Sequence, residues 1–138
     1  MTARELTEDL IRRYYEAFNR GGDREAFLTM LDPTVEHDLN NAGREIGVPA
    51  FRTFMQRMDR CYYEQITGLV VFASEDGARA AAEFTVLGTY RETDDGLPPA
   101  SGQTYRLPAG AFFEIRDGRV GRVTMYYNLK EWLRQIGA

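Results

Sequence analysis

The sequence has very few of the residues that carry metal, disulfide or thiol chemistry. Its 138 residues include one cysteine, Cys61, and one histidine, His37. A single cysteine excludes an intramolecular disulfide, and together with a single histidine it cannot supply the ligands of a zinc site. We therefore expect no metal ion, and we interpret Cys61 as a small buried apolar residue.

Long apolar runs, basic stripes and glycine-rich phosphate-binding motifs are also missing. No stretch approaches the roughly 20 apolar residues that cross a bilayer, and the charged first residues lack the apolar region of a secretory signal. The formal net charge is -4 with both signs interspersed, so no surface for nucleic-acid phosphates is expected. We expect a cytoplasmic protein with no cofactor, no nucleic-acid partner and no membrane contact.

Apolar residues at helical spacing fill the first half of the chain. They predict a first helix over residues 2–19, closed by the glycine pair that follows it. A short second helix is expected to end before Pro33, because the residue ahead of a proline disfavours helical backbone. Pro49 suits the first turn of a third helix, whose buried face extends to Tyr62.

The rest of the chain has the pattern of strands and turns. Residues 34–38 are predicted as a short strand and residues 39–47 as a polar loop. Four long strands are predicted at 65–73, 78–91, 103–116 and 119–129. Their short connections make neighbouring strands antiparallel, and residues 130–136 are expected to form a short helix or an extension. Gly88 and Gly110 predict bulges or bends within the long strands.

Three amphipathic helices and an antiparallel meander bury both of their apolar surfaces if a bent sheet wraps around the helices. The chain shows no internal repeat or linker that would divide it. The sequence therefore predicts a single α+β domain over residues 1–138, shaped as a cone.

Three segments and one glycine form a recognisable pattern: YYEAFNRGGD over residues 14–23, LDPTVEHD over residues 31–38, Gly47, and RVTMYYN over residues 122–128. In this order they resemble the NTF2-like superfamily, and within it the ketosteroid isomerase-related and SnoaL-like polyketide cyclase branch. The resemblance implies an NTF2-like, or cystatin-like, cone in which three N-terminal helices pack on a curved antiparallel sheet and enclose a pocket. It also implies a small hydrophobic ligand or substrate, and a homodimer formed through the sheet.

The resemblance to the steroid isomerases implies a catalytic tyrosine and a catalytic base. Tyr14 matches their oxyanion-donating tyrosine on the first helix. Their general base matches His37 when the segments are aligned without a gap, and Asp38 after a shift of one residue. Neighbours on a strand face opposite ways, so one of the two is expected to face the cavity. The residues also allow structural roles, with Asp38 capping Asn40 and Asn41 in the loop that follows.

Further residues are expected around the ligand. Those predicted to line the pocket are Tyr127, Asn40, Phe54, Phe84, Phe112 and Met125. The isomerases also place a protonated aspartic acid in the third long strand, where residues 108–113 of this sequence contain no acid. Without it about half of that oxyanion hole remains, at a cost on the order of 3 kcal/mol of transition-state stabilisation.

These residues support three hypotheses. In the first, the protein is a cofactor-independent isomerase or cyclase, in which Asp38 or His37 removes a proton beside a carbonyl and Tyr14 holds the oxyanion. In the second, it is a non-catalytic ligand-binding or dimerisation module. The third, an epoxide hydrolase, requires two acids that flank an arginine; the predicted strands show no such pattern, so this hypothesis ranks last. On the first hypothesis Asp38→Asn abolishes turnover, whereas unchanged turnover favours His37 or no catalysis.

Overall fold

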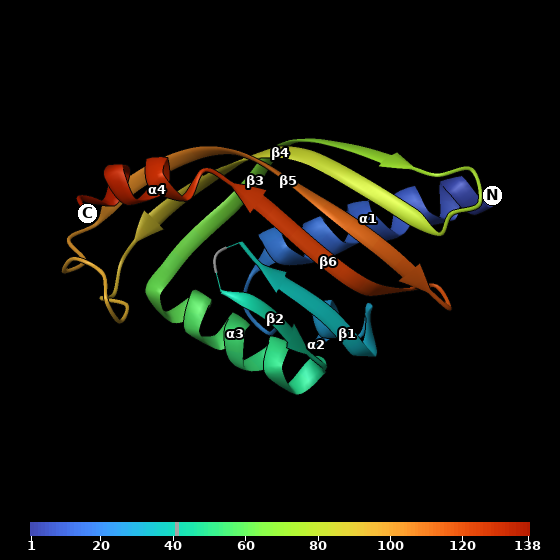
Figure 1. Ribbon diagram of the computed structural model, residues 1–138, viewed down its shortest axis with the longest axis horizontal. Helices are drawn as coiled ribbons and strands as arrows, with labels where there is room; N and C mark the ends of the chain where they lie inside the picture. The colour runs from blue at the N-terminus through green and yellow to red at the C-terminus, as the bar shows by residue number, and fades with distance from the viewer. Residues whose placement is uncertain (41) are drawn as a thin grey trace.

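The computed structural model describes residues 1–40 and 42–138, which form four helices and six strands. In chain order these are α1 (Ala3–Arg20), α2 (Glu25–Leu28), β1 (Leu31–Leu39), β2 (Gly43–Ile46), α3 (Val48–Cys61), β3 (Tyr62–Ala73), β4 (Arg79–Tyr90), β5 (Gln103–Arg116), β6 (Arg119–Tyr127) and α4 (Leu129–Ile136). Figure 1 shows α1 behind the sheet, α3 beside β1 and β2, and α4 beyond the end of β6.

The six strands form one curved sheet in the order β2-β1-β6-β5-β4-β3. The four long strands from β3 to β6 pair antiparallel, as the sequence predicts. β2 pairs antiparallel with β1 at the edge, and β1 adds one parallel pair by lying beside β6. The pairing of β1 with β6 therefore joins the first third of the chain to its last long strand.

The segment between the second and third helices differs from its prediction. Residues 39–47, predicted as a polar loop, contain β2, which begins at Gly43. The second helix is a single turn, and residues 31–33 belong to β1 instead of to the end of that helix. Pro33 is accommodated there because β1 is not paired with β6 between Leu31 and Glu36. Asn41 lies outside the described residues.

The bulges of the sheet also differ from their predicted positions. β4 and β5 stay in unbroken register through Gly88 and Gly110. The register of β3 with β4 shifts instead between Thr67 and Val70, where Gly68 has a φ of 65° that a residue with a Cβ rarely adopts. The glycines of β4 and β5 are therefore not sites of bulges.

The sheet has an inner face that the helices cover and an outer face that they leave open. Inner and outer residues alternate along the strands, and the inner side chains pack with those of α1, α2 and α3 in one buried core. On β5, for example, Phe113 is fully buried whereas Phe112 is 51% exposed. Among the helices described, none combines the length and the apolarity needed to span a membrane.

Candidate functional site

His37 on β1 points to the inner face and lies against the third helix. Its side chain is buried, and its ring stacks on the ring of Phe51 with the two centroids 4.2 Å apart. The ring of Phe54 meets it edge-on at 4.7 Å. Because neighbours on a strand face opposite ways, Asp38 points to the outer face. Of the two residues that match the isomerase base, His37 is the one that faces the interior.

Glu45 on β2 lies directly opposite His37 in the register of the two strands. Residues opposite each other in an antiparallel pair share one face of the sheet. His37 Nδ1 and Glu45 Oε1 are both buried, and neither has a hydrogen-bond partner among the residues that the structure describes. Within residues 1–40 and 42–138, no cluster of three His, Cys, Asp or Glu side chains is arranged to hold a metal ion.

The electrostatics of the interior favour a neutral imidazole. Burial lowers the pKa of His37 from 6.5 to about 4, although the negative charge of Asp38 acts in the opposite direction. Desolvation disfavours the charged form of any buried group, and for a histidine this means loss of the proton. At neutral pH the His37 ring is therefore neutral: one nitrogen carries a proton, and the other is an acceptor.

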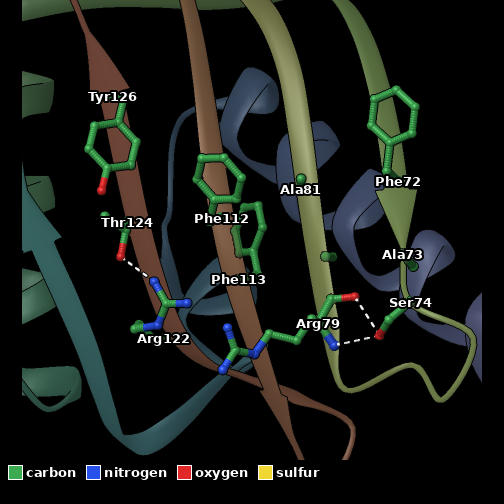
Figure 2. Close-up of a pocket in the computed structure, with 11 residues that line it drawn as sticks. Phe72, Ala73, Ser74, Arg79, Ala81, Phe112, Phe113, Arg122, Thr124 and Tyr126 are labelled. Atoms are coloured by element: carbon green, nitrogen blue, oxygen red, sulfur yellow. Dashed lines mark hydrogen bonds between the residues drawn. The ribbon is translucent and has the colours of Figure 1, made fainter.

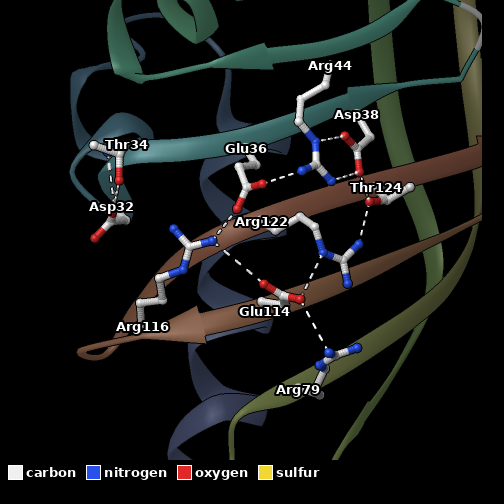
Figure 3. A network of polar contacts seen from close by, with 10 residues as sticks. All are labelled: Asp32, Thr34, Glu36, Asp38, Arg44, Arg79, Glu114, Arg116, Arg122 and Thr124. Carbon is white, nitrogen blue, oxygen red and sulfur yellow. Dashed lines mark hydrogen bonds and ion pairs between the residues drawn. The ribbon is translucent and has the colours of Figure 1, made fainter.

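Asp38 belongs to a network of ion pairs on the outer face (Figure 3). Arg44 Nε donates to one of its oxygens at 2.6 Å, and the Thr124 hydroxyl donates to the other at 2.6 Å. The hydrogen bonds from Arg44 are the largest cause that lowers the pKa of Asp38 to about 2. A carboxylate held in this way is a poor proton acceptor at neutral pH.

The same network contains an acid–arginine–acid arrangement. The Arg44 side chain lies between Asp38 and Glu36 and forms an ion pair with each. This order of groups resembles the set that an epoxide hydrolase requires. However, the Arg44 side chain is 45% exposed on the outer face, so the arrangement does not form an apolar, enclosed site.

Tyr14 on α1 is buried among aromatic rings. Its ring lies 4.6 Å from that of Phe27 and 5.5 Å from that of Phe113, measured between centroids. Burial raises the pKa of its hydroxyl. Phe27 in turn contacts Phe51, on which His37 stacks. Two phenylalanine rings therefore link Tyr14 to His37, and no hydrogen bond joins the two residues.

A second polar group on the inner face is Glu64 of β3. It lies in one row across the sheet with Gly88 of β4 and Tyr105 of β5. The Tyr105 hydroxyl donates a hydrogen bond to Glu64 Oε2 at 2.5 Å. Burial raises the pKa of Glu64, whereas this hydrogen bond acts to lower it. The inner face of the sheet therefore carries two acids, Glu45 and Glu64, in addition to His37, and the buried Asp94 lies beyond the end of β4.

The residues predicted to line the ligand divide between the two faces. Phe84, Met125 and Tyr127 lie on the inner face, and Phe54 packs against that face from α3. The Asn40 amide donates to the backbone carbonyl of Tyr127 at 3.1 Å and so ties the end of β1 to β6. Phe112 is on the outer face, as is Asp38, because strand alternation turns both side chains away from the helices.

Two open grooves lie against the outer face, with volumes of about 470 Å³ and 750 Å³. Phe72, Phe112 and Tyr126 line both, and each of these side chains is more than half exposed. Figure 2 shows the three rings on the face of the sheet away from α1, with Arg79 and Arg122 near one end of the first groove. An enclosed pocket between the helices and the sheet stays a prediction.

Comparison with known proteins identifies the family. A model of the SnoaL-like domain matches residues 11–123, which is most of the chain. The chain belongs to the SnoaL-like family. This result and the fold confirm the predicted resemblance to the NTF2-like superfamily. No curated protein matches this SnoaL-like chain.

Solved structures agree with this SnoaL-like assignment. A candidate polyketide cyclase from Xanthomonas campestris pv. campestris is 52% identical over 99% of this chain and 100% of that chain, with a TM-score of 0.95. Another from Pseudomonas putida KT2440 is 51% identical over 99% of both chains, with a TM-score of 0.92. An NTF2-like protein from Anabaena variabilis ATCC 29413 shares 18% identity over 91% of this chain and 92% of that chain, and its TM-score of 0.74 shows likeness of fold alone.

Sequence reasoning misses the inner acids of this SnoaL-like chain, Glu45 and Glu64. Glu45 falls in the segment predicted as a loop, and the four residues of β2 have no apolar alternation that would place Glu45 opposite His37. Glu64 comes just before the first predicted long strand. Counting back by two from the buried Ile66 places it on the inner face, so this signal was present in the pattern.

Proposed function

We propose that this SnoaL-like chain is a cofactor-independent isomerase or cyclase that acts on a small hydrophobic carbonyl compound at the inner face of its sheet, with His37 as the base. One observation carries the proposal. His37 and Glu45 share the inner face, and each has a buried polar atom without a hydrogen-bond partner among the described residues. Burying such an atom costs free energy unless something bonds to it, and a ligand would supply the missing bonds.

In the proposed reaction, neutral His37 takes a proton from the carbon beside the carbonyl. The C–H bond breaks, an N–H bond forms, and the electron pair moves onto the carbonyl oxygen as an enolate. The negative charge of Asp38, the next residue on the strand, favours the imidazolium that forms. Because the pKa of His37 is lowered to about 4, this imidazolium is a stronger acid than an ordinary one and returns its proton more readily.

Two products follow from the enolate. Where a C=C bond is conjugated with the enolate, return of the proton from His37 to the far carbon of that dienolate gives an isomer with a shifted double bond. Alternatively, the enolate carbon attacks a second carbonyl of the same molecule, so that a C–C bond forms and the new alkoxide takes the proton from His37. The second route closes a ring. The half-identical relatives described as candidate polyketide cyclases favour this route, since polyketides contain several carbonyls with acidic C–H bonds between them.

The test follows deuterium uptake from D2O into 2-tetralone, a hydrophobic ketone with acidic hydrogens, by proton NMR. The wild-type protein is expected to accelerate exchange, and His37→Gln is expected to lower the protein-dependent rate by about 10²-fold or more. Asp38→Asn is the matched control because it changes the next residue on the same strand, on the outer face. Equal rates for the wild type and His37→Gln, or a loss confined to Asp38→Asn, would contradict the proposal.

We also propose that the outer face joins two copies of the chain. Phe72, Phe112 and Tyr126 expose a contiguous aromatic surface, which is uncommon on a sheet that faces water. The neighbouring charges have both signs, as a surface that pairs with itself about a two-fold axis requires. This surface supports a dimer whichever function the inner face has.

Light scattering coupled to size-exclusion chromatography tests the dimer. We expect the wild type to elute as a dimer and Phe112→Asp as a monomer, because the new carboxylate would be buried without a partner. Leu6→Asp is the control, since Leu6 is 54% exposed on α1, away from the sheet. A monomeric wild type, or a dimeric Phe112→Asp protein, would count against this proposal.

A further inference from the structure

Glu64 is an inner carboxylate whose charge is not compensated by a cation. Its Oε2 accepts the hydrogen bond from Tyr105, and no described residue donates to its Oε1. No arginine or lysine is among the groups that shift its pKa, and the one charged neighbour that does, Asp59, is itself an acid. An ionised carboxylate accepts hydrogen bonds at both oxygens, so Glu64 has unused acceptor capacity.

Gly88 fixes the position of Tyr105 beside Glu64. A Cβ at position 88 would lie 2.1 Å from the Tyr105 Cζ and 2.5 Å from its hydroxyl oxygen. The backbone of β4 is extended here, so conformation does not require the glycine. Its missing side chain lets the tyrosine ring lie across β4 and bring the hydroxyl from β5 to Glu64 on β3.

Trp132 of α4 forms an aromatic wall over this row. Its ring contacts those of Tyr62, Tyr105 and Tyr127, with centroids 5.8, 6.1 and 6.3 Å apart. Tyr62 and Tyr105 are buried, whereas Trp132, Tyr127 and Glu64 are only partly buried. The row is therefore partly exposed at Trp132, Tyr127 and Glu64, and the charge of Glu64 acts on the Tyr127 hydroxyl.

We infer that Glu64, Tyr127 and Trp132 form a binding site for an apolar cyclic ligand that presents a hydrogen-bond donor, either a hydroxyl or an ammonium group. The donor meets Glu64 Oε1, and the apolar body packs on the rings of Tyr127 and Trp132. Tyr105 is a positioning residue that holds Glu64 Oε2. The site uses the same inner face as the proposed function but does not depend on His37, so either can fail without the other.

Trp132 makes the site directly observable, because it is the one tryptophan of the chain. The probes are decahydro-2-naphthol, decahydro-2-naphthylamine and the methyl ether of the alcohol, none of which absorbs where tryptophan is excited. The alcohol or the amine is expected to change Trp132 emission and to bind at least tenfold more tightly than the ether, which has no donor. Preference for the alcohol identifies a hydroxyl ligand, and preference for the amine an ammonium ligand.

Two variants separate this site from general apolar binding. Glu64→Met keeps the length of the side chain and is expected to remove the preference over the ether. Glu75→Gln is the matched control, since it removes a carboxylate from an exposed hairpin turn and is expected to leave the preference unchanged. Equal binding of all three probes to the wild type, an unchanged preference in Glu64→Met, or binding that leaves Trp132 emission unchanged would overturn the inference.

The pH dependence of binding provides a second readout that does not require Glu64→Met to fold. The titratable groups facing Glu64 are Tyr105 on β5, Tyr127 on β6 and Asp59 on α3. Protonation of Glu64 in acid is expected to abolish the preference. Tyr105→Phe removes the hydrogen bond that lowers the pKa of Glu64, so the midpoint of this loss is expected at a higher pH in that variant. Identical midpoints in the two proteins would overturn the assignment to Glu64.

Discussion

His37 and Asp38 are neighbours on β1, yet they lie in opposite electrostatic environments. His37 is buried against Phe51, and its Nδ1 has no partner in the part of the chain that the structure describes, whereas Asp38 is held by Arg44 and Thr124 on the outer face. Burial lowers the pKa of the histidine, and hydrogen bonds from the arginine lower that of the aspartate. A one-residue step along a strand thus separates a neutral, unpartnered base from a carboxylate that is already neutralised.

The acids of the two faces differ in the same way. On the outer face, Glu114 lies within 3.3 to 3.6 Å of three arginines, Arg79, Arg122 and Arg116. On the inner face, Glu64 has one hydrogen bond from a tyrosine and no ion pair among the described residues. Buried ionisable groups that the protein leaves uncompensated are candidates for meeting a ligand. The outer carboxylate of Glu114 is instead paired with arginines.

The largest expected difference between the faces is in packing energy, and the neighbours Phe113 and Phe112 measure it. Phe113→Ala is expected to lower the free energy of unfolding by about 3–5 kcal/mol, because it leaves a cavity in the core. Phe112→Ala is expected to lower it by less than about 1 kcal/mol, since half of that side chain is already in water. Urea unfolding at low protein concentration measures both values.

If Phe112→Ala lowered the free energy of unfolding as much as Phe113→Ala does, the two faces would not differ in packing energy. Such a result would mean that the outer face is part of a folding core, as in a dimer whose protomers do not fold alone. Repeating the unfolding at higher protein concentration identifies that case, because the stability of a dimer rises with protein concentration.

Much of the fold follows from periodicity. The helix predicted over residues 2–19 is α1, and each of the four predicted long strands overlaps a strand of the meander. These elements have local signals, because a long amphipathic pattern specifies both the element and its buried face. β2 has no such signal. Its four residues form a strand because they pair with β1 and contact α3. Its placement depends on tertiary contacts that propensity does not contain.

The candidate site was less predictable, and for a physical reason. The sequence indicates that His37 and Asp38 face opposite ways, but deciding which one faces inward requires the register of β1 beside β6. Tyr14 was expected next to the base, and the structure fills that space with Phe27 and Phe51. Contacts between distant segments therefore decide which polar groups meet. The catalytic roles of these residues stay predictions.

The pH dependence of stability gives a smaller and sharper test of the two environments. Between pH 6.5 and about 4 the unfolded chain protonates its histidine while the folded chain keeps His37 neutral. Stability is therefore expected to fall as the pH falls through this window, by about 3 kcal/mol in total. His37→Leu removes this dependence and, by replacing an unpartnered buried nitrogen, is expected to be no less stable than the wild type at neutral pH.

Asp38→Asn is the control in the same acid titrations followed by circular dichroism. In the wild type, the lowered pKa of Asp38 stabilises the folded state at pH values above 3.8, the pKa of the unfolded chain. That contribution is lost as the pH falls toward 2. Asp38→Asn is therefore expected to keep the wild-type slope between pH 6.5 and 4. If it removed that slope, or if His37→Leu kept it, the group that remains uncharged in the folded protein would not be His37. The contrast between the inner and outer faces of β1 would then have another cause.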